Sequence, residues 1–140
     1  MASKVKIRVN GLVHNVTASL DTPLLYVLHN ELKLHGPRFG CGLAQCGACS
    51  VLLDGKEIRS CVTPVAAVGG KAIVTLEGLP AAWAKARGTT AATPAALHPL
   101  QQAFMEHHGL QCGFCTPGML MLATGVLERE PDISDDDLVD

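Results

Sequence analysis

The sequence has few aromatic residues and no long apolar run. Phenylalanine, tryptophan and tyrosine make up 4% of its 140 residues. The longest apolar stretch, near Met119–Leu127, is too short for the ~20 residues of a membrane-spanning helix. The N-terminus carries basic residues but lacks the apolar region of a secretory signal. We therefore expect a soluble, cytoplasmic protein, although export together with a partner would leave no trace in this sequence.

The sequence also lacks an excess of one charge and the common catalytic motifs. With 11 basic against 13 acidic residues its net charge is −2, which argues against a general nucleic-acid binder. It has no phosphate-binding glycine loop and no recognisable nucleophile triad. Its six cysteines are about 4% of the 140 residues, well short of the roughly 8–10% that marks a disulfide scaffold. Because these cysteines are clustered in a chain without an export signal, we interpret them as metal ligands or redox groups.

The first part of the chain has the pattern of a small α+β domain. Residues 4–10 alternate between polar and apolar side chains, as in a half-buried strand. Asn10-Gly11 and Asp54-Gly55 favour the two-residue turns of β-hairpins. Between the hairpins, the sequence predicts a helix that is capped by Thr22 and ended by Gly36. We expect this domain to occupy residues 1–78.

The second part of the chain is predicted to be all-α. Residues 79–97 are rich in alanine, threonine and proline, and we expect a linker there, with at most a short helix around Trp83. Residues 98–140 then favour helices that begin near Pro99, Thr116 and Ser134. Only six residues follow Ser134, fewer than two helical turns. We therefore expect a helical domain that is incomplete, with its bundle truncated at the C-terminus.

The first cysteine group has the spacing C-x4-C-x2-C, with a fourth cysteine further on. This order is typical of a plant-type [2Fe–2S] cluster. Gly40, Gly42 and Gly47 would allow the chain to curl around such a cluster and leave amide groups free to bond the sulfurs. The alternatives are a thioredoxin-type dithiol and half of a zinc site, which leave the remaining cysteine and the glycines unexplained. The group consists of Cys41, Cys46, Cys49 and Cys61.

The second cysteine group is a C-x2-C pair, Cys112 and Cys115, directly before a predicted helix N-terminus. Free amides and the helix dipole at such a position suit an anionic cluster. A C-x2-C pair alone is a weak indication, and half of a zinc ribbon is the alternative. No cysteine follows Cys115, so two further ligands would have to come from elsewhere.

Taken in order, the motifs cover nearly the whole chain: RVNG, FGCGLAQCGACSVLLDG, RSC, LHPLQQAF and QCGFCTPGML. In this order they resemble the small iron–sulfur subunit of the molybdenum hydroxylases, the family of xanthine dehydrogenase and aldehyde oxidoreductase. Ala44 stands where many relatives have glycine. The resemblance implies a β-grasp, ferredoxin-like N-terminal domain followed by a helical-bundle [2Fe–2S] domain.

The resemblance also implies roles for individual residues. The ligands of an outer [2Fe–2S] cluster would be Cys41, Cys46, Cys49 and Cys61. Cys112 and Cys115 would be half of the ligands of an inner cluster, the other half coming from a C-R-C-T-G-Y motif after the third helix. That motif is absent from the 140 residues, and we expect truncation to be the reason. Gln111 matches a glutamine that lies against the pterin of the molybdenum cofactor in the large subunit.

The function implied is electron transfer within an oxidoreductase complex, with no substrate chemistry on this chain. A large subunit would hold molybdenum and pterin, and electrons would pass through the inner and outer clusters to a flavin subunit or a cytochrome. Two alternatives remain at this point. A free-standing ferredoxin would leave the helical domain unexplained, and a zinc-binding interaction module would be colourless. The substrate, the acceptor and the reduction potentials cannot be read from this sequence.

Overall fold

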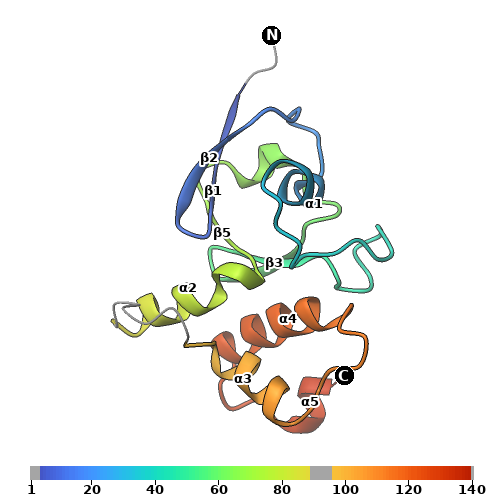
Figure 1. The fold of residues 1–140 in the computed structure, drawn as a ribbon, viewed down its shortest axis with the longest axis vertical. Coiled ribbons are helices and arrows are strands. Elements are labelled where there is room, and N and C mark those ends of the chain that lie inside the picture. Colours follow the sequence, from blue (N-terminus) through green and yellow to red (C-terminus); the bar gives the residue numbers. More distant parts are fainter. Residues whose placement is uncertain (1–3, 89–95, 140) are drawn as a thin grey trace.

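A computed structural model describes residues 4–88 and 96–139. A sheet with a covering helix forms one part of the molecule, and the α-helices that follow the last strand form the other (Figure 1). The sheet has five strands in the order β2-β1-β5-β3-β4. Its strands are β1 (Val5–Val9), β2 (Leu12–Val16), β3 (Ser50–Leu53), β4 (Lys56–Arg59) and β5 (Ala72–Val74). The predicted α+β class is confirmed.

Two short hairpins set the register of the sheet. Strand β1 pairs antiparallel with β2, and β3 pairs antiparallel with β4. At the first turn Asn10 and Gly11 have φ angles of 51° and 82°, and at the second Asp54 and Gly55 have 48° and 82°. Two consecutive positive φ angles define the type I′ turn that these dipeptides favour. Strand β5 then joins the hairpins, since it runs parallel to β1 and antiparallel to β3.

The helix that covers the sheet is shorter than predicted. It begins as α1 (Leu24–Tyr26), continues as the π-helical turn η1 (Val27–Glu31), and has Pro23 rather than Thr22 at its cap. It also ends before the predicted stop at Gly36, because Lys33 adopts a φ of 56°. A residue in the left-handed region cannot continue a right-handed helix. The chain therefore leaves the helix early and reaches the first cysteine group without regular secondary structure.

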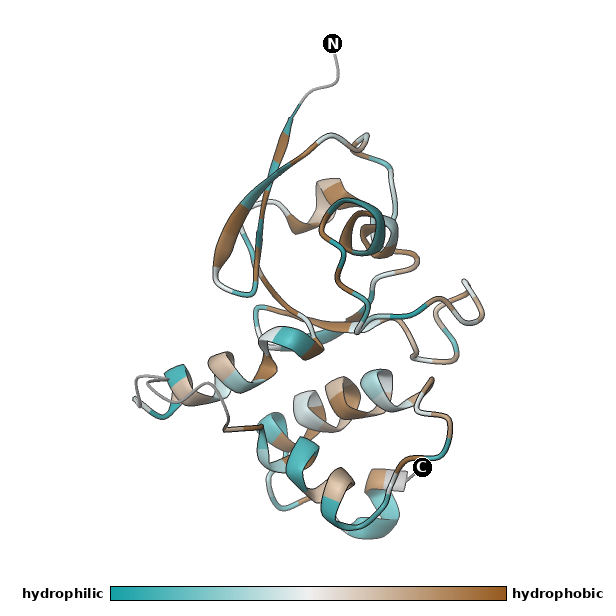
Figure 2. Cartoon of the chain, viewed as in Figure 1, coloured by the Kyte–Doolittle hydropathy of each residue, from teal (hydrophilic) through white to brown (hydrophobic). Residues whose placement is uncertain are grey.

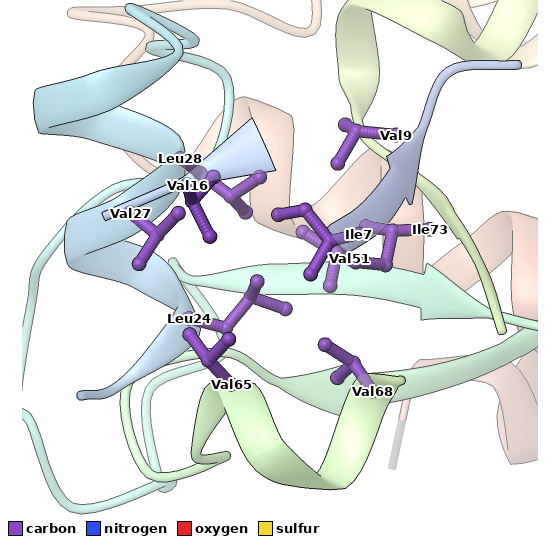
Figure 3. Close-up of a cluster of buried hydrophobic side chains, with 10 residues drawn as sticks. All are labelled: Ile7, Val9, Val16, Leu24, Val27, Leu28, Val51, Val65, Val68 and Ile73. Carbon is purple, nitrogen blue, oxygen red and sulfur yellow. The ribbon is translucent and has the colours of Figure 1, made fainter. Parts of the chain in front are cut away.

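The main core lies between the sheet and this helix (Figure 3). Strand residues on one face of the sheet pack against the helix and against the 3₁₀ turn η2 (Val65–Val68). Its buried members are Ile7, Val9, Val16, Leu24, Val27, Leu28, Val51, Val65, Val68 and Ile73. Side chains alternate between the two faces of a strand, so every second residue of β1 points inward, as the sequence predicts.

The opposite face of the sheet is covered by the second part of the chain. The helices of this part are α2 (Leu79–Ala86), α3 (Pro99–Glu106), α4 (Thr116–Arg129) and α5 (Asp135–Val139), preceded by the 3₁₀ turn η3 (Leu76–Gly78). Helix α4 lies against β3 and β4, and α3 packs on α4. Leu52, Leu79 and Met121 form a second buried cluster between β3, α2 and α4. Figure 2 shows hydrophobic residues on both β3 and α4. A strand that is buried on both faces thus connects the two parts.

Helix α2 occupies the first eight residues of the linker predicted over residues 79–97. The composition allowed only a short helix around Trp83, but Leu79 is buried against the sheet and stabilises a longer one. Residues 89–95 of this linker lie outside the described residues. Within residues 4–88 and 96–139, no helix is long and apolar enough to cross a membrane.

Candidate metal centres

The first cysteine group lies on the loop between η1 and β3, with Cys61 just after β4. The loop is exposed at Cys46 and buried at Cys49, so it passes from the surface into the sheet. The structure places the four cysteines in two pairs, Cys41 beside Cys46 and Cys49 beside Cys61. A [2Fe–2S] cluster with four cysteine ligands takes two per iron, and the two pairs match this demand.

The sulfur of Cys41 accepts three backbone hydrogen bonds. The amide groups of Leu43, Gln45 and Cys46 each donate to Cys41 Sγ at 3.3 Å. These bonds, with that of Cys46 the strongest, lower the pKa of the Cys41 thiol to about 6. The amide of Cys41 in turn donates to Cys46 Sγ at 3.3 Å. The folded loop therefore stabilises the thiolate at Cys41, the form in which cysteine binds metal.

The glycines of this loop act partly as predicted. Gly42 and Gly47 have φ angles of 68° and 75°, in the region that glycine tolerates best. Gly40 is needed for a different reason, since a Cβ atom there would lie 2.6 Å from Cys46 Sγ. Ala44 also adopts a positive φ, 59°. Glycine at this position would avoid that strain.

The second pair is held by the start and the end of the β3-β4 hairpin. Ser60 Oγ donates to the carbonyl oxygen of Cys49 at 2.6 Å, which places Cys61 beside it. Burial raises the pKa of the Cys49 thiol, and the neighbouring Cys61 side chain also raises it. Cys49 is therefore protonated at neutral pH unless a cation compensates the charge of its thiolate.

The donor set fits an iron–sulfur cluster. Thiolates are the soft ligands that such clusters require, and amide groups already point at the sulfur of Cys41. Within the part of the chain that the structure describes, no group of three or more His, Cys, Asp or Glu side chains is close enough to hold a single metal ion.

The second cysteine group lies on the loop between α3 and α4. Cys112 and Cys115 are both exposed, and Cys115 occupies the cap position of α4. Gln111 is also exposed, directly before the pair. All three predicted residues therefore lie on one surface loop at the N-terminal end of the longest helix. Two thiols at this position can supply half of a four-ligand site.

Helix α4, which follows the second cysteine loop, packs directly on the first cysteine loop. A Cβ atom on Gly118 would lie 2.9 Å from Ala48 Cα and would collide with the carbonyl oxygen of Gly47. A Cβ atom on Gly47 would in turn lie 2.8 Å from the Leu122 side chain. Helix α4 thus packs backbone to backbone on the segment between Cys46 and Cys49. Spacing alone could not show this contact.

Arg38 is a residue that the sequence analysis missed. Its backbone amide donates to the carbonyl oxygen of Ala48 at 2.8 Å, and its Nη1 donates to that of Gly113 at 2.7 Å. Its guanidinium carbon also lies 5.1 Å from the centre of the Phe114 ring. The only indication in the sequence is a basic residue three positions before the first cysteine.

Glu77 anchors the segment that leads into the first cysteine loop. Its carboxylate accepts from the Gly36 amide at 2.7 Å and from Thr75 Oγ1 at 2.6 Å. Desolvation favours the protonated form, but these and other local hydrogen bonds outweigh it and lower the pKa of this carboxyl below its usual 4.5. The depressed pKa stabilises the fold above about pH 4.5, and this contribution is lost as the pH falls through the folded-state value.

A Glu77→Gln substitution should therefore destabilise the protein at pH 7 by about 1 kcal/mol, a value reduced for the exposure of this residue. The difference from the wild type should shrink at acidic pH, as the pH falls from 4.5 through the lowered pKa of the folded-state carboxyl and the wild-type side chain becomes protonated as well. Urea unfolding at pH 7 and at acidic pH measures it. The control is Glu106→Gln, since the carboxylate of Glu106 accepts a bond from the exposed Gln102 side chain on the same helix. A pH-independent difference would contradict the assignment.

Comparisons with known proteins give the family of this chain. Residues 76–140 match the family described as the [2Fe-2S] binding domain. The chain is 45% identical to a nicotinate dehydrogenase subunit of Pseudomonas putida, over 99% of this chain and 80% of that protein. The chain belongs to the small iron–sulfur subunits of the molybdenum hydroxylases. The predicted family is confirmed.

Other members of the molybdenum hydroxylases resemble this protein in sequence and in fold. Aldehyde oxidoreductase of Megalodesulfovibrio gigas is 43% identical over the whole of this chain, which spans 14% of that longer protein. The crystal structure of quinoline 2-oxidoreductase from Pseudomonas putida 86 contains a chain with a TM-score of 0.81 and 33% identity. The match covers 96% of this chain and 76% of that one.

Membership in this family settles the general role of the subunit. It is an electron-transfer component of an oxidoreductase complex and binds iron and sulfur. Because its relatives are small subunits, larger partner subunits are implied. The free-standing ferredoxin and the zinc-binding module are not favoured, since a [2Fe-2S] binding domain extends over the helical region.

Proposed function

We propose that this subunit holds two [2Fe–2S] clusters, one in each cysteine loop. Cys41, Cys46, Cys49 and Cys61 hold the outer cluster, and Cys112 and Cys115 supply half of the ligands of the inner one. The observation that carries the proposal is that three backbone amides donate hydrogen bonds to Cys41 Sγ. Cys41 lies beside Cys46, and Cys49 lies beside Cys61. When bound, the clusters supply a one-electron relay between a molybdenum–pterin centre and an acceptor.

The protein residues hold and insulate this relay. The loop amides of the first site offset negative charge on Cys41, and the β3-β4 hairpin buries Cys49. The exposed position of Gln111 and the Cys112–Cys115 loop supports their placement against a large subunit that carries the pterin, with Gln111 contacting it. The first domain, a β-grasp unit over residues 1–78, then faces a flavin subunit or a cytochrome. We place the complex in the cytoplasm.

The test is the iron and acid-labile sulfide content of the purified complex, together with paramagnetic resonance after reduction. We expect four irons for each copy of this chain and two distinguishable [2Fe–2S] signals. Two irons per copy would remove the inner cluster from the proposal. A colourless complex that contains zinc and gives no signal would contradict it altogether.

A further inference from the structure

Arg38 connects the two cysteine loops. It lies three residues before Cys41, and its backbone pairs with Ala48 at the far end of the same loop. Its side chain reaches Gly113, which lies 75 residues further along the chain and between Cys112 and Cys115. One residue therefore contacts both loops, with its backbone in one and its guanidinium in the other.

The contact has the chemistry of a stable, oriented link. The arginine guanidinium carries a delocalised positive charge, and its donors suit a carbonyl acceptor. Gly113 adopts a φ of 75°, a conformation that few other residues tolerate, and its carbonyl accepts the bond. The Phe114 ring, 5.1 Å from the guanidinium carbon, adds a cation–π contact. Both contacts fall on the two residues that separate the cysteines of the pair.

We propose that Arg38 is a positioning residue that fixes the Cys112–Cys115 loop against the first cysteine loop and places a permanent positive charge beside it. The inference rests on the proposed function, because the charge matters only if a cluster binds there. A fixed cation favours the more negative, reduced state of a neighbouring cluster and so raises its reduction potential. Arg38 thus acts both on the geometry between the two sites and on the potential of the inner one.

A second cross-contact provides a matched control. Arg129 on α4 pairs with Glu57 on β4, so it also joins the helical part of the chain to the sheet. It makes no contact with either cysteine loop among the interactions of the described residues. Loss of Arg129 therefore loosens the same interface without touching the Gly113 carbonyl.

The experiment compares Arg38→Met, Arg38→Lys and Arg129→Met in the assembled complex. Hydrogen–deuterium exchange of the backbone amides of residues 111–115 reports on the loop and requires no cluster. Redox titration followed by paramagnetic resonance gives the potential of each cluster and the magnetic coupling between them. Iron content identifies any variant that has lost a cluster.

For Arg38→Met we expect roughly tenfold faster exchange across residues 111–115, the effect of losing a hydrogen bond from a charged donor. We also expect a more negative potential for one cluster and a weaker magnetic coupling. Arg38→Lys should restore the potential, because it keeps the charge, and Arg129→Met should change none of these readouts.

The inference would be overturned if Arg38→Met kept the exchange rates and the cluster potential of the wild type. It would also be overturned if Arg129→Met changed these readouts as much as Arg38→Met does. A wild-type complex without clusters would contradict the proposed function, while the exchange measurement would still decide whether Arg38 fixes the loop.

Discussion

A Cys46→Ser substitution is expected to lower the rate at which the natural acceptor is reduced by about 100-fold or more. The large subunit should keep its molybdenum and pterin. Serine is a hard oxygen donor and a poor substitute for a soft thiolate on iron. Cys46 Sγ also accepts the Cys41 amide, so its loss disturbs the pair as well as the ligand count. Replacing a residue that only hydrogen-bonds a metal ligand typically costs 10–100-fold in metal affinity or activity. Removing a ligand itself should cost at least as much.

Three measurements on the purified complex check this result. Turnover with the natural acceptor, iron content and the paramagnetic signals should all fall, with two irons lost per copy of this chain. The control is Gln45→Ala in the same loop, since Gln45 bonds Cys41 Sγ through its backbone amide and alanine keeps that bond. Turnover of Cys46→Ser with the natural acceptor at the wild-type rate would refute the relay.

A Gly118→Ala substitution should destabilise the protein by about 2 kcal/mol, within the roughly 1–3 kcal/mol that overpacking costs. Alanine is normally the better helix former by about 1 kcal/mol, so the helix itself would gain. The added Cβ would, however, meet backbone atoms of Gly47 and Ala48, which cannot rotate away as a side chain can. Steric overlap therefore outweighs propensity, and α4 must move away from the first cysteine loop.

Gly125→Ala in the same helix is the matched control. Its Cβ would lie 2.6 Å from Glu57 Oε2, the end of a flexible side chain. Displacing Glu57 costs only an exposed ion pair with Arg129, worth about 1 kcal/mol or less. Urea unfolding followed by circular dichroism should thus separate the two variants. Equal stability of Gly118→Ala and the wild type would show that the backbone contact does not hold the helix.

The sequence predicts best what depends on neighbours along the chain. The two hairpins follow from Asn10-Gly11 and Asp54-Gly55, because few residue pairs tolerate two positive φ angles. The cap of α5 is equally local, since Ser134 Oγ accepts the Asp137 amide at 3.2 Å. The helix after Pro23 is predicted less well, because the left-handed conformation of Lys33, which ends it, has no marker in its residue type.

By itself, the sequence determined the chemistry of this protein: the spacing of six cysteines, the glycines between them and the resulting family. Only the tertiary structure decided how the two cysteine groups meet. Gly118 packs on Gly47 and Arg38 bonds Gly113 across 75 residues. Local patterns reflect the conformations open to a few consecutive residues. Contacts between distant segments arise only when both faces of β3 are buried, one by α1 and the other by α4.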